Sequence, residues 1–297
     1  MEFTPKSFTL PDGRSLDLFV EGPEDGTPLL SHHGTPSAGL PYRPFVEAAA
    51  ARGLRWVSYS RPGYGESART DGRSVADCVA DVEAIMDHLG ADAFFTTGAS
   101  GGGPHTLACA ALLPDRVLGC AAIAAVAPYE AEGLDWMAGQ GPENVAEWEA
   151  QLAGPEPHRA FLEAEAAQMR EAASPESFID AIGGLLPPVD RAALTGEYAK
   201  SMIAGTHRAL LRGIWGWFDD DAAFMAPWGF DLDAMRVPVA LWQGGQDLMV
   251  PFAHGEWLAA HVSGARAHLD PAQGHLSIAA GSFPQVLDDL IEHRSHG

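Results

Sequence analysis

Hydrophobic and polar positions follow two different periods along the chain up to residue 127, and these periods alternate. Short apolar runs bounded by glycine, proline or charged residues predict strands. They cover residues 16–20, 28–32, 54–60, 93–97 and 117–127. Apolar side chains spaced three or four residues apart predict helices over 44–52, 75–89 and 100–113. Strands that alternate with helices in this way favour a parallel sheet with helices on both faces.

The alternation stops between residues 129 and 236 and resumes afterwards. Acidic, helix-like segments over 144–153 and 158–173 replace the strands there, and this stretch holds 19 Asp and Glu against 7 Lys and Arg, with five of the eight tryptophans. Strands at 237–243 and 265–269 and helices at 252–261 and 284–293 follow. We therefore expect a core domain formed by 1–128 and 237–297, with 129–236 inserted as a helical cap. The cap would cover the carboxyl edge of the sheet, where such folds bind ligands.

The composition is typical of a globular protein with an acidic surface. A chain of 297 residues with 46% hydrophobic positions can bury a large core, and its net charge of −22 disfavours binding to nucleic acids or anionic membranes. No signal peptide and no bilayer-spanning apolar stretch is visible, so we expect a cytoplasmic protein, with a homo-oligomer compatible with the sequence. Cys78, Cys109 and Cys120 lack metal-ligand spacing and are expected to be buried thiols. We expect neither a metal nor a cofactor.

The segment from Gly98 to Gly102 reads Gly-Ala-Ser-Gly-Gly, with Ser100 at its centre. It follows a predicted strand and opens a predicted helix, which is the setting in which G-x-S-x-G forms a sharp turn that exposes a nucleophile. Small residues on either side let the strand and helix approach closely. The helix N-terminus adds free N–H groups near developing negative charge. The alternative interpretation is a glycine-rich turn in which Ser100 only caps the helix.

Five segments together resemble the α/β-hydrolase superfamily, and in particular its capped serine hydrolases, which include esterases and proline iminopeptidases. In chain order they are Ser31-His32-His33-Gly34-Thr35-Pro36, Arg61-Pro62-Gly63-Tyr64-Gly65-Glu66-Ser67, Gly98 to Gly102, Gly244-Gly245-Gln246-Asp247-Leu248-Met249-Val250-Pro251 and Gly274-His275-Leu276. The order of nucleophile, acid and histidine is that of the family. The resemblance covers nearly the whole chain except 129–236. It implies an α/β-hydrolase fold with a mostly parallel eight-stranded sheet.

Two residues are candidates to complete a catalytic triad with Ser100. A serine hydroxyl needs a base, and the base needs an orienting carboxylate. His275 follows the last predicted strand, and Asp247 lies in a glycine-rich turn after the strand 237–243. The resemblance implies that His275 is the base and Asp247 the acid. Taken alone, His275 could be a surface-loop histidine and Asp247 a residue that stabilises its own turn.

The oxyanion formed during acyl transfer needs two N–H donors. The backbone of Gly101, directly after the nucleophile, is the first candidate. The resemblance places the second donor at Thr35, in the loop after 28–32, with His33 and Gly34 as loop support. Since only the backbone of Thr35 would serve, we expect its side chain to be dispensable.

The expected function is cleavage of a small or medium carboxylic ester, a small-molecule substrate, through a Ser-His-Asp triad and an acyl-enzyme. Tryptophans in the inserted segment favour an apolar pocket. Three alternatives stay open. The first is an aminopeptidase of proline iminopeptidase type, whose acidic cap residues would bind a free amine. The second is a protein of the same fold that binds a small molecule with slow or no turnover, and the third is a serine-type perhydrolase.

Overall fold

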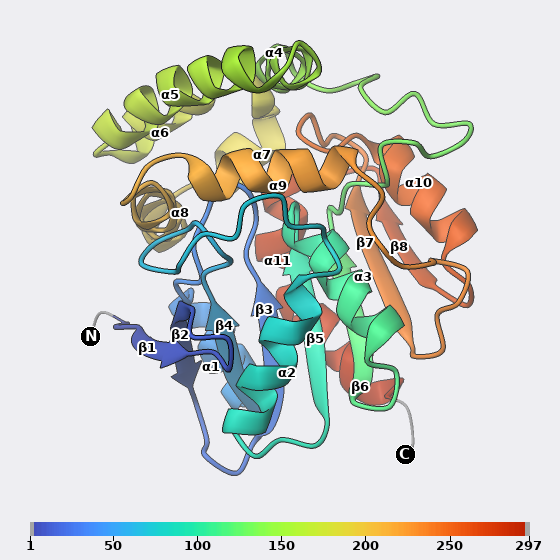
Figure 1. Ribbon diagram of the computed structural model, residues 1–297. Helices are drawn as coiled ribbons and strands as arrows, with labels where there is room; N and C mark the ends of the chain where they lie inside the picture. Colours follow the sequence, from blue (N-terminus) through green and yellow to red (C-terminus); the bar gives the residue numbers. More distant parts are fainter. Residues whose placement is uncertain (1–2, 295–297) are drawn as a thin grey trace.

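The computed structural model describes residues 3–294, and these form an eight-stranded sheet covered by helices (Figure 1). The strands are β1 (Lys6–Thr9), β2 (Ser15–Glu21), β3 (Thr27–His32), β4 (Leu54–Tyr59), β5 (Phe94–Ala99), β6 (Val117–Ile123), β7 (Val239–Gly244) and β8 (Arg266–Asp270). Their order across the sheet is β1-β2-β4-β3-β5-β6-β7-β8. The pairs β1–β2 and β2–β4 are antiparallel, whereas all other pairs are parallel. The predicted mostly parallel, eight-stranded sheet is therefore confirmed.

The central strands β5 and β6 are almost completely buried because helices cover both of their faces. β6 reads Val-Leu-Gly-Cys-Ala-Ala-Ile and β5 reads Phe-Phe-Thr-Thr-Gly-Ala, so small or apolar side chains dominate both strands. A nearly continuous apolar run is what a parallel strand between two helical layers requires. Because β3, β5, β6, β7 and β8 are parallel, their carboxyl ends meet at one edge of the sheet.

Two hydrophobic cores lie on opposite faces of the sheet. The helices α2 (Cys78–His88), α3 (Gly102–Leu112) and α10 (Phe252–His261) contribute to one core, and α1 (Arg43–Ala50) and α11 (His275–Glu292) contribute to the other. Cys78, Cys109 and Cys120 lie in the first of these cores as free thiols, which confirms the prediction of buried cysteines.

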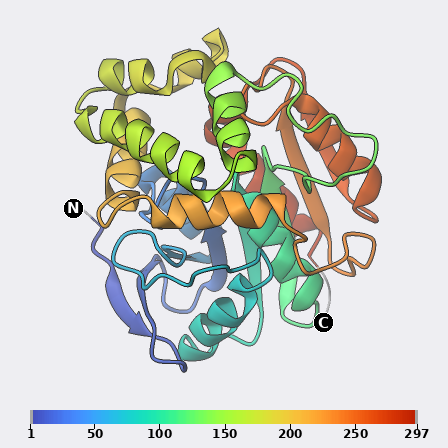
Figure 2. The ribbon, with the colours of Figure 1, turned by 45° about the horizontal axis from the view of Figure 1, so that its top comes forward.

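The segment between β6 and β7 contains helices in place of strands within the described chain, and it covers the sheet edge at which the parallel strands end (Figures 1 and 2). The helices are α4 (Pro142–Leu152), α5 (Pro155–Glu171), α6 (Pro175–Ile182), a short 3-10 turn (Gly183–Leu185), α7 (Pro188–Ala193), α8 (Gly196–Ala209) and α9 (Trp215–Met225). In Figure 1, α4, α5 and α6 form the outer layer and α9 lies between them and the sheet.

Three elements differ most from the sequence-based expectation. The edge strand β1 was not predicted, since it is short and largely exposed and carries no continuous apolar run. The strand predicted over 117–127 ends at Ile123. The last helix was expected over 284–293, but α11 begins at His275 and continues through Pro284. Proline is favoured in the first turn of a helix, so the sequence predicts a start at Pro284. The helix in fact begins nine residues earlier.

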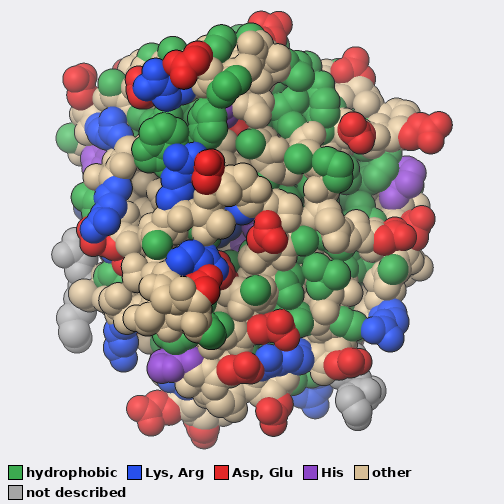
Figure 3. Space-filling view, viewed as in Figure 1, with side chains coloured by type: hydrophobic (Ala, Val, Ile, Leu, Met, Phe, Trp, Pro, Cys, Tyr) green, Lys and Arg blue, Asp and Glu red, His purple; other side chains and the backbone are tan. Residues whose placement is uncertain are grey.

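On the face of the molecule seen in Figure 3, the acidic side chains are dispersed. Figure 3 shows Asp and Glu side chains scattered over the viewed face, with Lys and Arg side chains between them. Every helix within residues 3–294 is too short or too polar to cross a membrane.

Candidate active site

Ser100 occupies a strained turn between β5 and α3. Its φ angle is 55°, in the left-handed region that residues with a side chain rarely adopt. The turn depends on two glycines, because a Cβ on Gly98 would overlap the carbonyl of Gly102, and a Cβ on Gly102 would overlap the carbonyl of His32. Strain held in place by such close packing is typical of a nucleophile at the end of a central strand.

His275 and Asp247 form a hydrogen-bonded pair although 28 positions separate them. The Nδ1 atom of His275 lies 2.7 Å from Oδ2 of Asp247, so Nδ1–H donates to the carboxylate and Nε2 is left as the basic nitrogen. The other carboxylate oxygen of Asp247 accepts backbone N–H bonds of 2.8 Å from Met249 and 2.8 Å from Val250, which fix its orientation. Burial opposes a positive charge on His275, but Asp247 outweighs burial and raises the pKa of the imidazole.

Ser100, His275, Gly101 and Thr35 line one cavity of about 230 Å³ between the sheet edge and the helices above it. Asp247 lies behind His275, outside this lining and 3% exposed. The structure thus brings together the three segments that sequence reasoning selected, from the ends of β5, β7 and β8.

The loop after β3 lies directly against Ser100. A Cβ added at Gly34 would lie 4.0 Å from Oγ of Ser100, and one added at Gly101 would overlap the side chain of Thr35. His33 holds this loop to the next one, since its Nδ1 bonds the carbonyl of Gly34 at 2.8 Å and its Nε2 accepts the N–H of Arg61 at 3.0 Å. Burial lowers the pKa of His33, which keeps the ring neutral and able to accept.

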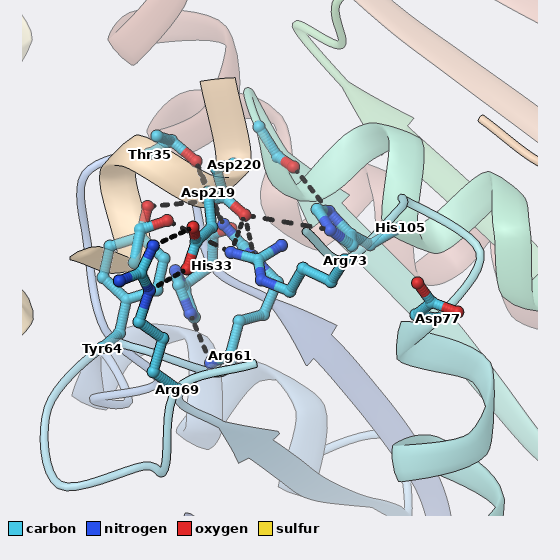
Figure 4. A network of polar contacts seen from close by, with 12 residues as sticks. His33, Thr35, Arg61, Tyr64, Arg69, Arg73, Asp77, His105, Asp219 and Asp220 are labelled. Atoms are coloured by element: carbon cyan, nitrogen blue, oxygen red, sulfur yellow. Dashed lines mark hydrogen bonds and ion pairs between the residues drawn. The ribbon is translucent and has the colours of Figure 1, made fainter. Parts of the chain in front are cut away.

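Asp220 of α9, which sequence reasoning did not select, is the centre of a buried network beneath this loop (Figure 4). One of its oxygens accepts bonds from Arg61 (2.6 Å), Tyr64 (2.8 Å) and the hydroxyl of Thr35 (2.5 Å). Its other oxygen accepts a bond of 2.6 Å from Arg73. Burial opposes the charge on Asp220, but the two arginines outweigh burial and hold its pKa well below the usual range. The side chain of Thr35 is therefore part of this network, whereas sequence reasoning assigned a role only to its backbone.

His105 joins the same network to the start of α3. Its Nδ1 lies 2.9 Å from the carbonyl of Gly101, and its Nε2 lies 4.0 Å from Asp220. Burial lowers the pKa of His105, so the ring is neutral and Nδ1–H donates to the carbonyl. Asp220 thus touches the loop of Thr35 directly and lies beside the histidine that supports Gly101.

The part of the cavity formed by the inserted helices is both apolar and acidic. Trp136, Trp148 and Trp217 line it, whereas the tryptophans at 215 and 228 do not. Carboxyl groups also reach the cavity, and they belong to Glu143, Glu147, Glu165 and Asp221. Within residues 3–294, no group of three or more His, Cys, Asp or Glu side chains is arranged to hold a metal ion.

Comparisons with known proteins agree with this architecture. Residues 27–281 match the family model described as the alpha/beta hydrolase fold. Epoxide hydrolase B of Mycobacterium tuberculosis is 28% identical over 150 residues, which are 48% of this chain and 42% of the relative. Haloalkane dehalogenase 2 of Mycobacterium bovis is 33% identical over 96 residues, which are 32% of this chain and 33% of the relative. The chain thus matches less than half the length of these curated relatives.

A solved structure covers far more of the molecule. The crystal structure of bromoperoxidase from Bacillus anthracis superposes with a TM-score of 0.71 at 19% identity, over 97% of this chain and 100% of that chain. Together with the matching family model, the sheet order and the serine turn define the class. This chain belongs to the α/β-hydrolase fold family.

Proposed function

We propose that this protein hydrolyses small or medium carboxylic esters, with Ser100 as nucleophile, His275 as base and Asp247 as the acid that orients the base. The observation that carries the proposal is the 2.7 Å bond between His275 and Asp247, in a pocket that His275 shares with the strained Ser100. The mainly apolar lining and the volume of about 230 Å³ suit an acyl group of modest size.

In the proposed reaction, Oγ of Ser100 attacks the ester carbonyl carbon while Nε2 of His275 takes the hydroxyl proton. The backbone N–H groups of Thr35 and Gly101 stabilise the oxyanion. His275 then protonates the leaving alcohol, and an acyl-enzyme remains. A water molecule gives a proton to His275 and attacks the acyl carbonyl, which releases the carboxylic acid and restores Ser100.

A serine at position 100 favours acyl transfer over epoxide opening or halide displacement, the reactions that the names of the two relatives indicate. If Ser100 displaced a halide or opened an epoxide, the product would be an ether on the enzyme. An ether has no carbonyl carbon for water to attack, so the enzyme would stay alkylated after one turnover. An ester or amide instead leaves an acyl-enzyme that water can cleave.

The test is a panel of p-nitrophenyl esters with acyl chains of increasing length. Ser100→Ala should lower kcat/KM by at least about a thousandfold, because the nucleophile is lost. His275→Gln should do the same, and circular dichroism should show both variants folded. In the wild type, the rate should rise with pH as the imidazolium loses its proton. Because the pKa of His275 is raised, the midpoint should lie above the 6.5 of an ordinary histidine.

A fluorophosphonate probe separates catalysis from simple binding. It should label the wild type at Ser100 and leave Ser100→Ala unlabelled. Folded wild-type protein that neither reacts with the probe nor hydrolyses any ester of the panel would contradict the proposal. It would favour the alternative of a small-molecule binding protein on the same fold.

The acidic wall of the cavity supports a second candidate, an aminopeptidase that binds the free amine of its substrate. Glu143 and Glu165 both face the cavity, and burial together with the Glu143 charge raises the pKa of Glu165. An ammonium group placed there would relieve this repulsion. Aminoacyl naphthylamides assayed beside the esters decide between the two activities. Faster cleavage of the naphthylamides, lost in Glu165→Gln, would favour the aminopeptidase.

A further inference from the structure

The helix that carries the catalytic base begins at the base itself. α11 starts at His275, so the N–H groups of its first turn have no acceptor within the helix. Asp190 of α7 supplies the acceptors from 85 positions earlier in the chain. Its Oδ2 accepts the N–H of His275 at 2.8 Å, and its Oδ1 accepts those of Leu276 at 3.1 Å and Ser277 at 2.8 Å.

This contact is buried and depends on a glycine. Asp190 is 0% exposed, and the three atoms nearest to a Cβ built on Gly274 all belong to its carboxylate. Any side chain at 274 would therefore push the carboxylate away from the helix. Asp190 and Gly274 together make a close fit between the inserted helices and the catalytic turn.

The N-terminus of a helix carries a partial positive charge that opposes a second positive charge beside it. His275 must become an imidazolium each time it takes the proton of Ser100. A carboxylate on the first turn offsets the helix charge and also fixes the backbone from which the imidazole projects. Asp247 acts on the ring, whereas Asp190 acts on the backbone of the same residue.

We propose that Asp190 is a positioning residue for the catalytic base, through which the inserted helices complete the active site instead of only covering it. The effect on turnover rests on the proposed function, whereas the effect on His275 itself does not. The charged groups that face His275 are Asp247, from the turn after β7, and Asp190, from α7. Tyr198 of α8 lies near Asp190 and stays neutral, because burial and Asp190 raise its pKa.

The first experiment is an NMR titration of the histidine imidazoles, with the signal of His275 assigned by its loss in His275→Gln. Asp190→Asn removes the charge and keeps the shape. It should lower the titration midpoint of His275 by about half a pH unit. On the best ester, kcat should fall by about tenfold while KM changes little, because the imidazole loses its alignment and not its substrate.

Two further variants make the outcome decisive. Asp180→Asn removes an exposed carboxylate from α6 and should change neither the midpoint nor kcat. Gly274→Ala displaces the Asp190 carboxylate without removing it and should shift the midpoint in the same direction. It takes the place of Asp190→Asn as the test if that variant does not fold. A folded Asp190→Asn with the wild-type midpoint and kcat would overturn the proposal. If Asp190→Asn lowers the midpoint of His275 but the wild type hydrolyses no ester, the proposed function alone is overturned.

Discussion

Two adjacent aspartates of α9, Asp220 and Asp221, are both fully buried, yet their surroundings are opposite. Asp220 faces the sheet, where Arg61 and Arg73 surround it and hold its pKa well below the usual range. Asp221 faces the inserted helices, where its near neighbours are Glu147 and His158. Burial and the charge of Asp220 raise the pKa of Asp221. Asp220 is therefore an ionised carboxylate, whereas the next residue along the helix, Asp221, shares a proton with Glu147.

The difference shows how the inserted helices are joined to the core. Asp220 forms a charged contact that crosses from α9 to the loops after β3 and β4, and it therefore fixes the loop of Thr35. Asp221 and Glu147 form a contact that holds a proton within the inserted helices, at the wall of the cavity. Removing one partner of a buried ion pair leaves an unpaired charge and is strongly destabilising, whereas replacing a carboxyl group that holds a proton leaves no charge unpaired. The two sites should therefore respond to mutation very differently.

The largest effect should come from Asp220→Ala. This change leaves the guanidinium groups of Arg61, 1% exposed, and Arg73, 4% exposed, buried without a counter-charge. The free energy of unfolding should fall by about 3–5 kcal/mol. Urea denaturation measures it, and Asp220→Asn should retain more stability because the amide oxygen still accepts hydrogen bonds.

The exposed pair of Arg52 and Asp288 provides the matched control for Asp220→Ala. Asp288 is 63% exposed, so Asp288→Ala removes a comparable ion pair in water and should cost far less stability. Equal losses of stability in the two variants would show that the buried network does not anchor the inserted helices.

The sequence indicates the proposed triad residues more clearly than it indicates the residues that support them. Ser100 lies in a motif of five residues, and the strand-to-helix setting of that motif can be read from local periodicity. Asp190 and Asp220 carry no such signal, because their partners lie 85 and 159 positions away and only the tertiary fold brings them together. The same holds for α11. Asp190 accepts the N–H groups of its first turn, a contact that no local pattern indicates, and the start predicted at Pro284 was too late.

A smaller effect is expected from Thr35→Val, which keeps the volume of the side chain but removes its hydroxyl. The hydroxyl donates to Asp220 and accepts a bond of 3.1 Å from Arg61, so its loss leaves a buried carboxylate with one donor fewer. The free energy of unfolding should fall by about 1.5–3 kcal/mol. The kcat for an ester should fall as well, since the backbone N–H of residue 35 shifts.

Thr35→Ser, which restores the hydroxyl, should recover both the stability and the kcat. If Thr35→Val keeps the wild-type values of both, the side chain is idle, and Asp220 does not fix the loop of Thr35 through it.

The smallest effect is expected from Glu147→Gln, because the carboxyl group of Glu147 already holds a proton. Burial and the Asp221 charge raise the pKa of Glu147 well above its usual range, so near neutral pH Glu147→Gln replaces one uncharged group with another. The amide can still accept the bond of 2.5 Å from the indole of Trp217 and donate to Asp221, and the free energy of unfolding should change by less than about 1 kcal/mol.

The pH dependence of stability carries the sharper test of Glu147. A raised pKa in the folded state means that the unfolded protein releases this proton first as the pH rises. The contribution of Glu147 is therefore complete below its unfolded pKa near 4.5 and is lost as the pH rises through the folded pKa. Thermal melts from pH 5 to pH 9 should show a loss of Tm in the wild type that is smaller in Glu147→Gln. Parallel curves for the two proteins would mean that Glu147 is ionised in the folded state, and the contrast between Asp220 and Asp221 would then vanish.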